Sequence, residues 1–306
     1  MRRTMLLCGV LATVAVADAG PAVAQQPPSD AANAKAAHPV PASVRVVRDV
    51  EYARYGERAV RLDLYLPPAS SGRPPWPGVL VVRGGGWRLT DKEGFGFIAG
   101  RLASEGFVAA SIEYRSSDEA KFPAAVHDVK AAVRWLRAHA AEYGVDPDAI
   151  GAIGGSAGGH LVTLLAASAD APGLEGEGGH PGTSSRVQAA VAMGCPCTLT
   201  TYEGKSLGGF VGEPIEAHRD AVRAASPATY VDASAAPLLL LHSPSDSIVP
   251  YQQSVDIAAA YQRAGAVVTL TPVDAPGAHF LWYEARYFPQ VMDQAVAFLR
   301  AHLLRR

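Results

Sequence analysis

The chain has 306 residues, of which 49% are hydrophobic, 18% are charged and 8% are aromatic. This composition fits one globular domain or two small ones and excludes a collagen, a coiled coil or a wholly disordered chain. Because 27 Lys and Arg are balanced by 29 Asp and Glu, the chain has no overall attraction to nucleic acid or to an anionic membrane, and we expect no nucleic-acid partner.

The first residues have the pattern of an export signal. Two arginines precede an apolar run over residues 5–17, and Ala22-Val23-Ala24 offers the small residues at which signal peptidase cuts. A membrane anchor is the alternative, but Asp18 and the Gly and Pro after it interrupt the run before the ~20 residues that a span needs. We therefore predict a signal peptide over residues 1–24, a secreted or periplasmic protein, and no stable membrane insertion after cleavage.

A leader separates this signal from the folded part of the chain. Residues 25–43 are rich in Ala and Pro and have neither aromatic side chains nor a hydrophobic period, which is typical of a flexible segment. The remaining residues, 44–306, contain no internal repeat and no second linker, so we predict one catalytic domain over this range.

Within this domain, apolar strand-like runs alternate with segments of helical period. Strands are predicted at 44–53, 59–66, 78–82, 107–114, 149–154, 187–193, 237–242 and 267–273, and helices at 97–104, 124–142, 157–169, 253–264 and 288–304. The alternation predicts an α/β fold, with a mostly parallel eight-stranded sheet covered by helices on both faces. Two stretches, 170–186 and 198–231, do not fit the alternation; we expect small loop insertions there that shape a binding site, and no large lid.

Two cysteines remain after the predicted signal, Cys195 and Cys197. On a strand, residues two apart in number would not present their side chains in the geometry that a disulfide needs, so we expect no bond between them. No second Cys or His pair stands at zinc spacing, and a metal site is not expected. We predict a tight turn after a buried strand.

The strongest chemical signal is the string Gly154-Gly155-Ser156-Ala157-Gly158. An apolar strand enters this Gly-x-Ser-x-Gly motif and a helix leaves it, which is the context in which a nucleophilic serine is lifted above a sheet on a sharp turn. The helix amino terminus adds its positive end to the site. We predict that Ser156 is a catalytic nucleophile.

A glycine-rich loop after an earlier strand supplies donors for the oxyanion that such a nucleophile creates. The string Arg83-Gly84-Gly85-Gly86-Trp87 follows the predicted strand 78–82. Because glycines let the backbone approach a substrate carbonyl, we predict that the N–H groups of Gly85, Gly86 and Trp87 form an oxyanion hole together with that of Ala157.

In the type of triad built on such a serine turn, the acid and the base follow the serine in the chain, in the order Ser, Asp, His, so both candidates must lie downstream of Ser156. Asp246 follows the predicted strand 237–242, and His279 follows the next one, so both belong to loops at the carboxyl edge of the sheet. We predict that His279 takes the serine proton and that Asp246 holds its tautomer. Asp256 and Asp274 are weaker candidates for the acid, because one lies on a helix and the other immediately before a proline turn.

The remaining histidines of interest are assigned structural roles. His127, His139 and His160 fall within predicted helices, and we expect them to pack or to face solvent. His242 is expected to form a hydrogen bond within its own loop.

Taken together, Ser156, Asp246, His279 and the triple-glycine loop resemble the α/β-hydrolase superfamily, in particular its acetyl-esterase, feruloyl-esterase and hormone-sensitive-lipase branch. Further strings are similar to the secreted carbohydrate-esterase type of that branch, namely Tyr114-Arg115, Phe122-Pro123-Ala124-Ala125-Val126-His127-Asp128-Val129 and Ala225-Ser226-Pro227. The likeness runs from about Val44 to Leu303.

This resemblance implies a serine carboxylic-ester hydrolase without metal or cofactor. It would act through an acyl-enzyme on short-chain acyl or hydroxycinnamoyl esters, including those of carbohydrates, so the expected partner is a small-molecule or oligosaccharide ester. An amide-cleaving hydrolase of the arylformamidase or peptidase type, and a non-catalytic binding protein of the same fold, are the alternatives.

The chain departs from that branch in two places. Arg83 stands where the branch usually has His, and Ser243-Pro244 replaces the glycine that commonly follows His242. We hypothesise that Arg83 anchors the glycine loop by donating to backbone carbonyls or to a carboxylate.

Five aromatic residues are candidates for an acyl or aromatic pocket, and simple packing is the alternative for each. They are Trp87, Tyr202, Phe210, Phe280 and Trp282.

Overall fold

The structure, a computed structural model, describes residues 38–169 and 171–304. The predicted signal peptide and residues 25–37 of the predicted leader lie outside this range. Residues 38–43 pack on the domain, since the ring of His38 lies 4.1 Å from that of Phe288 and the side chain of Val40 lies against Gly100. In the described part of the chain, no helix is long and apolar enough to cross a membrane.

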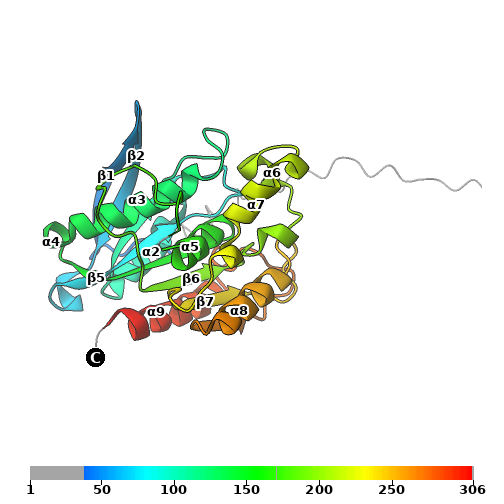
Figure 1. Cartoon of the computed structure of the whole chain (residues 1–306). Coiled ribbons are helices and arrows are strands. Elements are labelled where there is room, and N and C mark those ends of the chain that lie inside the picture. Colours follow the sequence, from blue (N-terminus) through cyan, green and yellow to red (C-terminus); the bar gives the residue numbers. More distant parts are fainter. Residues whose placement is uncertain (1–37, 170, 305–306) are drawn as a thin grey trace, which may run out of the picture.

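Strands and helices alternate along the chain, as Figure 1 shows. The strands are β1 (Arg45–Tyr55), β2 (Arg58–Leu66), β3 (Trp76–Val82), β4 (Val108–Ile112), β5 (Val145–Gly155), β6 (Ala189–Met193), β7 (Leu238–His242) and β8 (Val268–Pro272). The helices are α2 (Gly96–Ser104), α3 (Ala124–Ala138), α4 (Ala140–Tyr143), α5 (Ala157–Ala167), α6 (Ser206–Val211), α7 (Arg219–Ala225), α8 (Gln252–Ala264) and α9 (Phe288–Leu303).

All eight strands belong to one sheet, in the order β1-β2-β4-β3-β5-β6-β7-β8. β2 pairs antiparallel with both β1 and β4, and every other pair is parallel. The predicted fold class, a mostly parallel eight-stranded sheet, is therefore confirmed.

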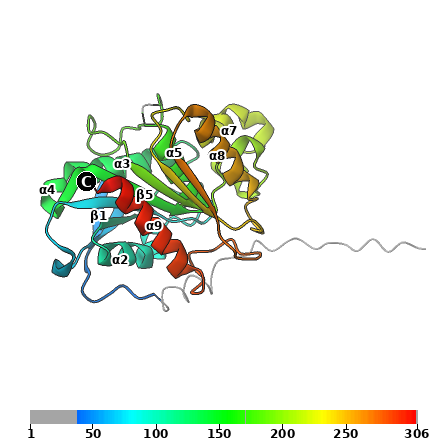
Figure 2. The ribbon, with the colours of Figure 1, turned by 90° about the horizontal axis from the view of Figure 1, so that it is seen from below.

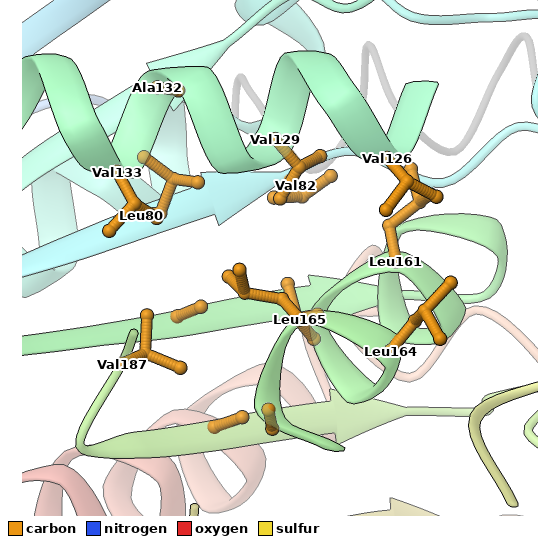
Figure 3. Packing of buried hydrophobic residues seen from close by; sticks show 14 of the residues in the cluster. Leu80, Val82, Val126, Val129, Ala132, Val133, Leu161, Leu164, Leu165 and Val187 are labelled. Carbon is orange, nitrogen blue, oxygen red and sulfur yellow. The ribbon is translucent and has the colours of Figure 1, made fainter. Parts of the chain in front are cut away.

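Helices cover both faces of this sheet, with α2 and α9 on one side and α3, α5 and α8 on the other (Figure 2). The residues of β3 show why both faces need cover: Leu80 and Val82 point into one core cluster, and Val79 and Val81 point into the other. All four are fully buried. Figure 3 shows Val126, Val129 and Val133 of α3 packed over Leu80 and Val82. The near-continuous apolar strands follow from this burial on two faces.

The loops that follow β3, β5, β6, β7 and β8 all leave the carboxyl edge of the parallel part of the sheet. The predicted insertion 198–231 lies at this edge and contains the short helices α6 and α7. The expectation for residues 170–186 is wrong. The described residues of this stretch, 171–186, stand between the end of α5 and the start of β6, so they lie at the amino edge, away from the carboxyl ends of the strands. A loop from helix to strand always returns the chain to the amino edge of a parallel sheet.

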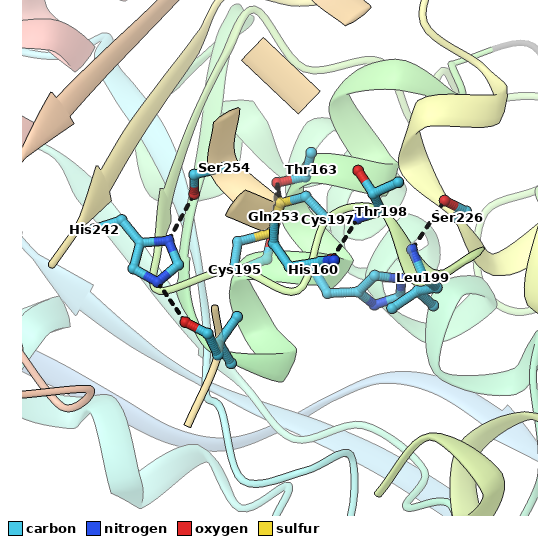
Figure 4. The surroundings of a disulfide bond; sticks show 12 residues. His160, Thr163, Cys195, Cys197, Thr198, Leu199, Ser226, His242, Gln253 and Ser254 are labelled. Atoms are coloured by element: carbon cyan, nitrogen blue, oxygen red, sulfur yellow. Dashed lines mark hydrogen bonds between the residues drawn. A yellow bond between two sulfur atoms is a disulfide. The ribbon is translucent and has the colours of Figure 1, made fainter. Parts of the chain in front are cut away.

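The prediction for the cysteines also needs correction, because Cys195 and Cys197 form a disulfide. Both residues lie in the loop after β6, which ends at Met193. The extended strand conformation that would keep the two sulfur atoms apart is therefore absent at these positions. Their Cα atoms lie 5.3 Å apart, within the ordinary range for a disulfide. Figure 4 shows the bond beside Thr163 of α5. The predicted turn is therefore closed covalently.

The motif strings around Arg115 and Ser226 hold the fold together. Arg115, just after β4, donates from Nη2 and Nε to both oxygens of the fully buried Asp128 on α3, at 2.8–3.1 Å. Ser226 Oγ accepts a hydrogen bond of 3.1 Å from the amide of Leu199 and so joins two parts of the 198–231 insertion. These positions carry structural contacts and lie outside the catalytic chemistry.

Candidate active site

Ser156 occupies the turn between β5 and α5 and has φ 51° and ψ −122°. A non-glycine residue in this region is strained and needs support from its surroundings. The support comes from close packing of the turn. A Cβ on Gly154 would lie 2.4 Å from the carbonyl oxygen of Gly158, so the motif needs glycine at position 154. The turn is fixed further by a 2.7 Å hydrogen bond from the Ser156 amide to the carbonyl oxygen of Met193.

The three predicted catalytic side chains meet in one hydrogen-bonded chain. His279 Nε2 lies 2.9 Å from Ser156 Oγ, and His279 Nδ1 lies 2.7 Å from Asp246 Oδ2. Ser156 is partly exposed, whereas the His279 and Asp246 side chains are 2% and 1% exposed. The serine can therefore meet a substrate while the groups behind it are shielded from water. Asp256 and Asp274 take no part in this arrangement; Asp256 accepts a hydrogen bond from Gln252 on α8, and Asp274 is exposed.

Four donors surround the carboxylate of Asp246. Its Oδ1 accepts from the amides of Ile248 and Val249, both at 2.8 Å, and its Oδ2 accepts from His279 and from His242 at 2.7 and 3.1 Å. Burial alone would raise the pKa of Asp246, but the hydrogen bonds from His242 and His279 outweigh it and hold the pKa below its ordinary value. The acid therefore stays ionised through the neutral range.

Gly194 forms the wall of the site on the β6 side, a role that the sequence analysis missed. It has φ 54°, and a Cβ there would lie 3.2 Å from the His279 ring and 3.5 Å from Asp246 Oδ2. A side chain at this position would press on the His279 ring and would also be strained by the positive φ. The signal available in the sequence was a glycine directly after a predicted strand of the sheet.

The glycine loop lies against the nucleophile turn, since a Cβ on Gly84 would stand 3.0 Å from the Cβ of Ser156, and it has an unusual conformation. Gly85, Gly86 and Trp87 have φ values of 146°, 60° and 60°. Among the described residues, the N–H groups of these three and of Ala157 donate to no protein acceptor, while the Ser156 amide is already used. Unpaired amides at a helix amino terminus and in a nest of positive φ values are suited to bind an anionic oxygen.

Arg83 links the two ends of this loop. Its guanidinium forms an ion pair with Asp91, which stands at the other end of the loop and also accepts a 2.8 Å hydrogen bond from the amide of Gly94. The hydroxyl of Tyr114 donates to the carbonyl oxygen of Arg83 at 2.9 Å. The contact with the Asp91 carboxylate is one of the two alternatives that the anchoring hypothesis offers.

We expect Arg83→Ala to lower kcat by about 10²-fold on a neutral ester, the loss attributed to one displaced oxyanion donor. Without the ion pair, residues 84–90 are held less firmly and their amides can drift from the reacting oxygen. Steady-state kinetics on the variant would measure the effect. Arg88→Ala is the matched control, because Arg88 lies in the same loop but is exposed and pairs with Asp118. An unchanged kcat, or a rise in KM alone, would contradict the anchoring role.

The five candidate pocket aromatics fall into two groups. Trp87, Phe210 and Trp282 are each 1% exposed, and the rings of the first two are stacked at 4.6 Å. For these three the packing alternative fits the structure. Tyr202 is 9% exposed and belongs to a core cluster, whereas Phe280 is partly exposed beside His279, at 4.8 Å between ring centres, so Phe280 presents ring surface next to the catalytic histidine.

His160 connects the nucleophile helix to the glycine loop and to the insertion. It is fully buried; its Nδ1 accepts from the indole N–H of Trp87 at 3.2 Å, and its Nε2–H donates to the carbonyl oxygen of Ala225 at 2.7 Å. His160 therefore packs in the core, as expected, and also forms two specific hydrogen bonds. Its place one turn after Ser156 is the signal that could have drawn attention to it.

Burial lowers the pKa of His160 to about 4, and stability should depend on pH accordingly. Above about pH 6.5 the residue is neutral in both states. Between pH 6.5 and 4 the unfolded chain binds a proton that the folded chain does not, so the free energy of unfolding falls by about 1.4 kcal/mol per pH unit from this group. Urea unfolding between pH 7 and 4 would show this, and His160→Gln should flatten that part of the profile. Equal slopes for the two proteins would refute it.

The described residues contain no group of three or more His, Cys, Asp and Glu side chains arranged to hold a metal ion.

The sheet order, the strained serine between strand and helix, and the Ser-His-Asp chain at the carboxyl edge place this protein in the α/β-hydrolase fold class. The resemblance inferred from the motifs is thereby confirmed. Within this class, residues 62–261 match the BD-FAE family, and the chain belongs to that family.

Similar proteins of known name are esterases. The chain is 36% identical over 220 residues to the "Probable carboxylic ester hydrolase LipM" of Mycobacterium tuberculosis, covering 67% of this chain and 49% of that protein. The chain spans about half the length of the curated relatives it matches.

Two solved structures are similar over most of both chains. The first is a truncated form of a carbohydrate esterase from gut microbiota, with TM-score 0.71 and 28% identity, covering 83% of this chain and 96% of that chain. The second is esterase 2 of Thermogutta terrifontis phosphorylated by paraoxon, with TM-score 0.70 and 27% identity, covering 87% and 97%.

Proposed function

We propose that this protein is a serine carboxylic-ester hydrolase that works through an acyl-enzyme. The observation that carries the proposal is the hydrogen-bonded chain from Ser156 Oγ through His279 to Asp246, with unpaired amides of the glycine loop and of Ala157 beside it. A nucleophile, a base with an oriented tautomer and oxyanion donors are the parts that acyl transfer needs.

In the proposed reaction, His279 Nε2 accepts the proton of Ser156 Oγ as this oxygen attacks the ester carbonyl. The developing oxyanion is bound by the amides of Gly85, Gly86 and Ala157. His279 then donates the proton to the departing alcohol, which leaves an acyl group on Ser156. A water molecule then gives a proton to His279 and attacks the acyl carbon. As the bond from this carbon to Ser156 Oγ breaks, His279 returns the proton to Oγ, and the carboxylic acid leaves.

We propose short acyl or hydroxycinnamoyl esters, including those of carbohydrates, as the substrate class. The 198–231 insertion contains only short helices and lies close to the reacting centre: Ser206 at the start of α6 lies near Gly86, with its Cβ 3.3 Å from where a Gly86 Cβ would stand. Among the residues that the structure describes, no large lid of the kind that suits long lipid chains covers the site. The likeness to a solved carbohydrate esterase supports the carbohydrate part of the proposal.

A panel of substrates assayed side by side tests this specificity. It contains p-nitrophenyl esters from acetate to palmitate, methyl hydroxycinnamates, acetylated xylan and an aryl formamide. We expect the highest kcat/KM on short acyl or hydroxycinnamoyl esters. A preference for long-chain emulsified lipid or for the amide would overturn the specificity proposal.

Titration with paraoxon separates a working nucleophile from a non-catalytic relative. Thermogutta terrifontis esterase 2 is phosphorylated by this compound, so it is a suitable probe. We expect one phosphoryl group per chain, located on Ser156 by mass spectrometry. Absence of labelling together with absence of turnover would favour a binding protein of the same fold.

We also propose that the protein acts outside the cytoplasm. The proposal is based on the basic start, apolar run and Ala-x-Ala string of residues 1–24. Amino-terminal sequencing of protein recovered from the periplasm or the medium would test it, and a retained residue 1 would contradict it.

A further inference from the structure

A second histidine contacts the carboxylate oxygen that His279 uses. His242, at the end of β7, is fully buried, and its Nε2 lies 3.1 Å from Asp246 Oδ2 and 3.0 Å from the carbonyl oxygen of Val249. Two imidazoles therefore share one oxygen of Asp246. The mechanism above uses only His279.

The neighbours of His242 determine which nitrogen carries its proton. A carboxylate and a carbonyl oxygen only accept hydrogen bonds, so Nε2 must be the donor to both. The other nitrogen, Nδ1, lies 2.7 Å from Ser254 Oγ on α8 and can accept the hydroxyl proton of that serine (Figure 4). The structure thus supports the tautomer with hydrogen on Nε2, aimed at Asp246.

The other titratable groups around this pair are His279, from the loop after β8, and two tyrosines. The Tyr251 ring lies 5.5 Å from the His242 ring, and Tyr202, from the loop after β6, lies near enough to Asp246 to feel its charge. Burial raises the pKa of both phenols, so neither gains charge in the neutral range. The charge that His242 faces is therefore that of Asp246.

We infer, taking the proposed ester-hydrolase function as given, that His242 is a positioning residue for the catalytic acid. By donating to Oδ2 it fixes this oxygen against His279 Nδ1, and by sharing the oxygen it reduces the negative charge that Asp246 presents to His279. Loss of the His242 donor would present the whole carboxylate charge to His279, so we expect the acid limb of the kcat/KM profile at higher pH in a variant that lacks this donor.

The test compares three variants of the full chain on p-nitrophenyl acetate between pH 5 and 9. His242→Leu removes the donor, His242→Gln offers an amide N–H in its place, and Ser243→Ala is the matched control. Ser243 is the adjacent buried residue, and its hydroxyl donates to the carbonyl oxygen of Ala275 at 2.6 Å without contacting Asp246. It tests the effect of losing any buried hydrogen bond in this loop.

For His242→Leu we expect kcat to fall about tenfold and the acid limb to move about one pH unit toward higher pH, the size expected from one lost hydrogen bond to a charged group. His242→Gln should recover most of the rate and of the limb position. Ser243→Ala should leave the limb in place. The inference would be overturned if the acid limb of His242→Leu stayed at the wild-type pH, or if the acid limb of Ser243→Ala moved by the same amount.

A second measurement does not depend on catalytic activity, so it still tests the inference if the His242 variants fail to fold. In Ser156→Ala protein at pH 7, nitrogen NMR should show the His242 proton on Nε2 and a non-protonated Nδ1. The opposite tautomer would refute the inference. If the wild-type chain cleaves no ester in the panel, the proposed function fails while this NMR result still tests His242; if it cleaves esters and the variants behave alike, only the inference fails.

Discussion

Replacing Ser156 by alanine is expected to lower kcat on a short-chain ester by about 10⁶-fold, the typical cost of removing a nucleophile of this kind. The serine Oγ is the only atom of the hydrogen-bonded chain placed to attack a substrate, and it receives its activation through the 2.9 Å contact with His279 Nε2. Burst kinetics and steady-state rates on p-nitrophenyl acetate would measure the loss.

The same variant should fold normally. Ser156 is partly exposed, and alanine removes only a hydroxyl whose partner is His279, so urea unfolding should give a nearly unchanged midpoint. Paraoxon should no longer label the protein. Turnover close to that of the wild type in a folded variant would show that another group is the nucleophile.

Asp246→Asn is expected to lower kcat by about 10⁴-fold, because an amide in this position favours the wrong tautomer of the catalytic histidine. The structure adds a second reason for a large loss. Asp246 Oδ2 accepts from both His279 and His242, and an asparagine NH₂ placed there would face two N–H donors.

Asp256→Asn and Asp274→Asn are the matched controls for this change. Both remove one carboxylate charge from the same region of the sequence, but Asp256 pairs with Gln252 on α8 and Asp274 is exposed. We expect both to retain kcat within a few-fold. If either control proved as damaging as Asp246→Asn, the assignment of the acid would be wrong.

Contacts local in sequence made much of this protein predictable. The strand, turn and helix around Ser156 follow from an apolar run, two glycines and a helical period that are adjacent in the chain, and the eight strands were visible for the same reason. Their order along the chain, with Asp246 and His279 after successive strands, predicted that both side chains would emerge at one edge, because parallel strands end together.

Only the tertiary structure decided which groups contact one another across that edge. It selects Asp246 over Asp256 and Asp274, brings Gly194 against His279, and brings two imidazoles to one carboxylate oxygen. It places residues 171–186 at the opposite edge of the sheet and joins Cys195 to Cys197. The physical reason is common to all of these: side-chain direction in a turn, and distance between loops far apart in sequence, depend on how the helices pack the sheet, and a pattern of residue types contains no measure of either.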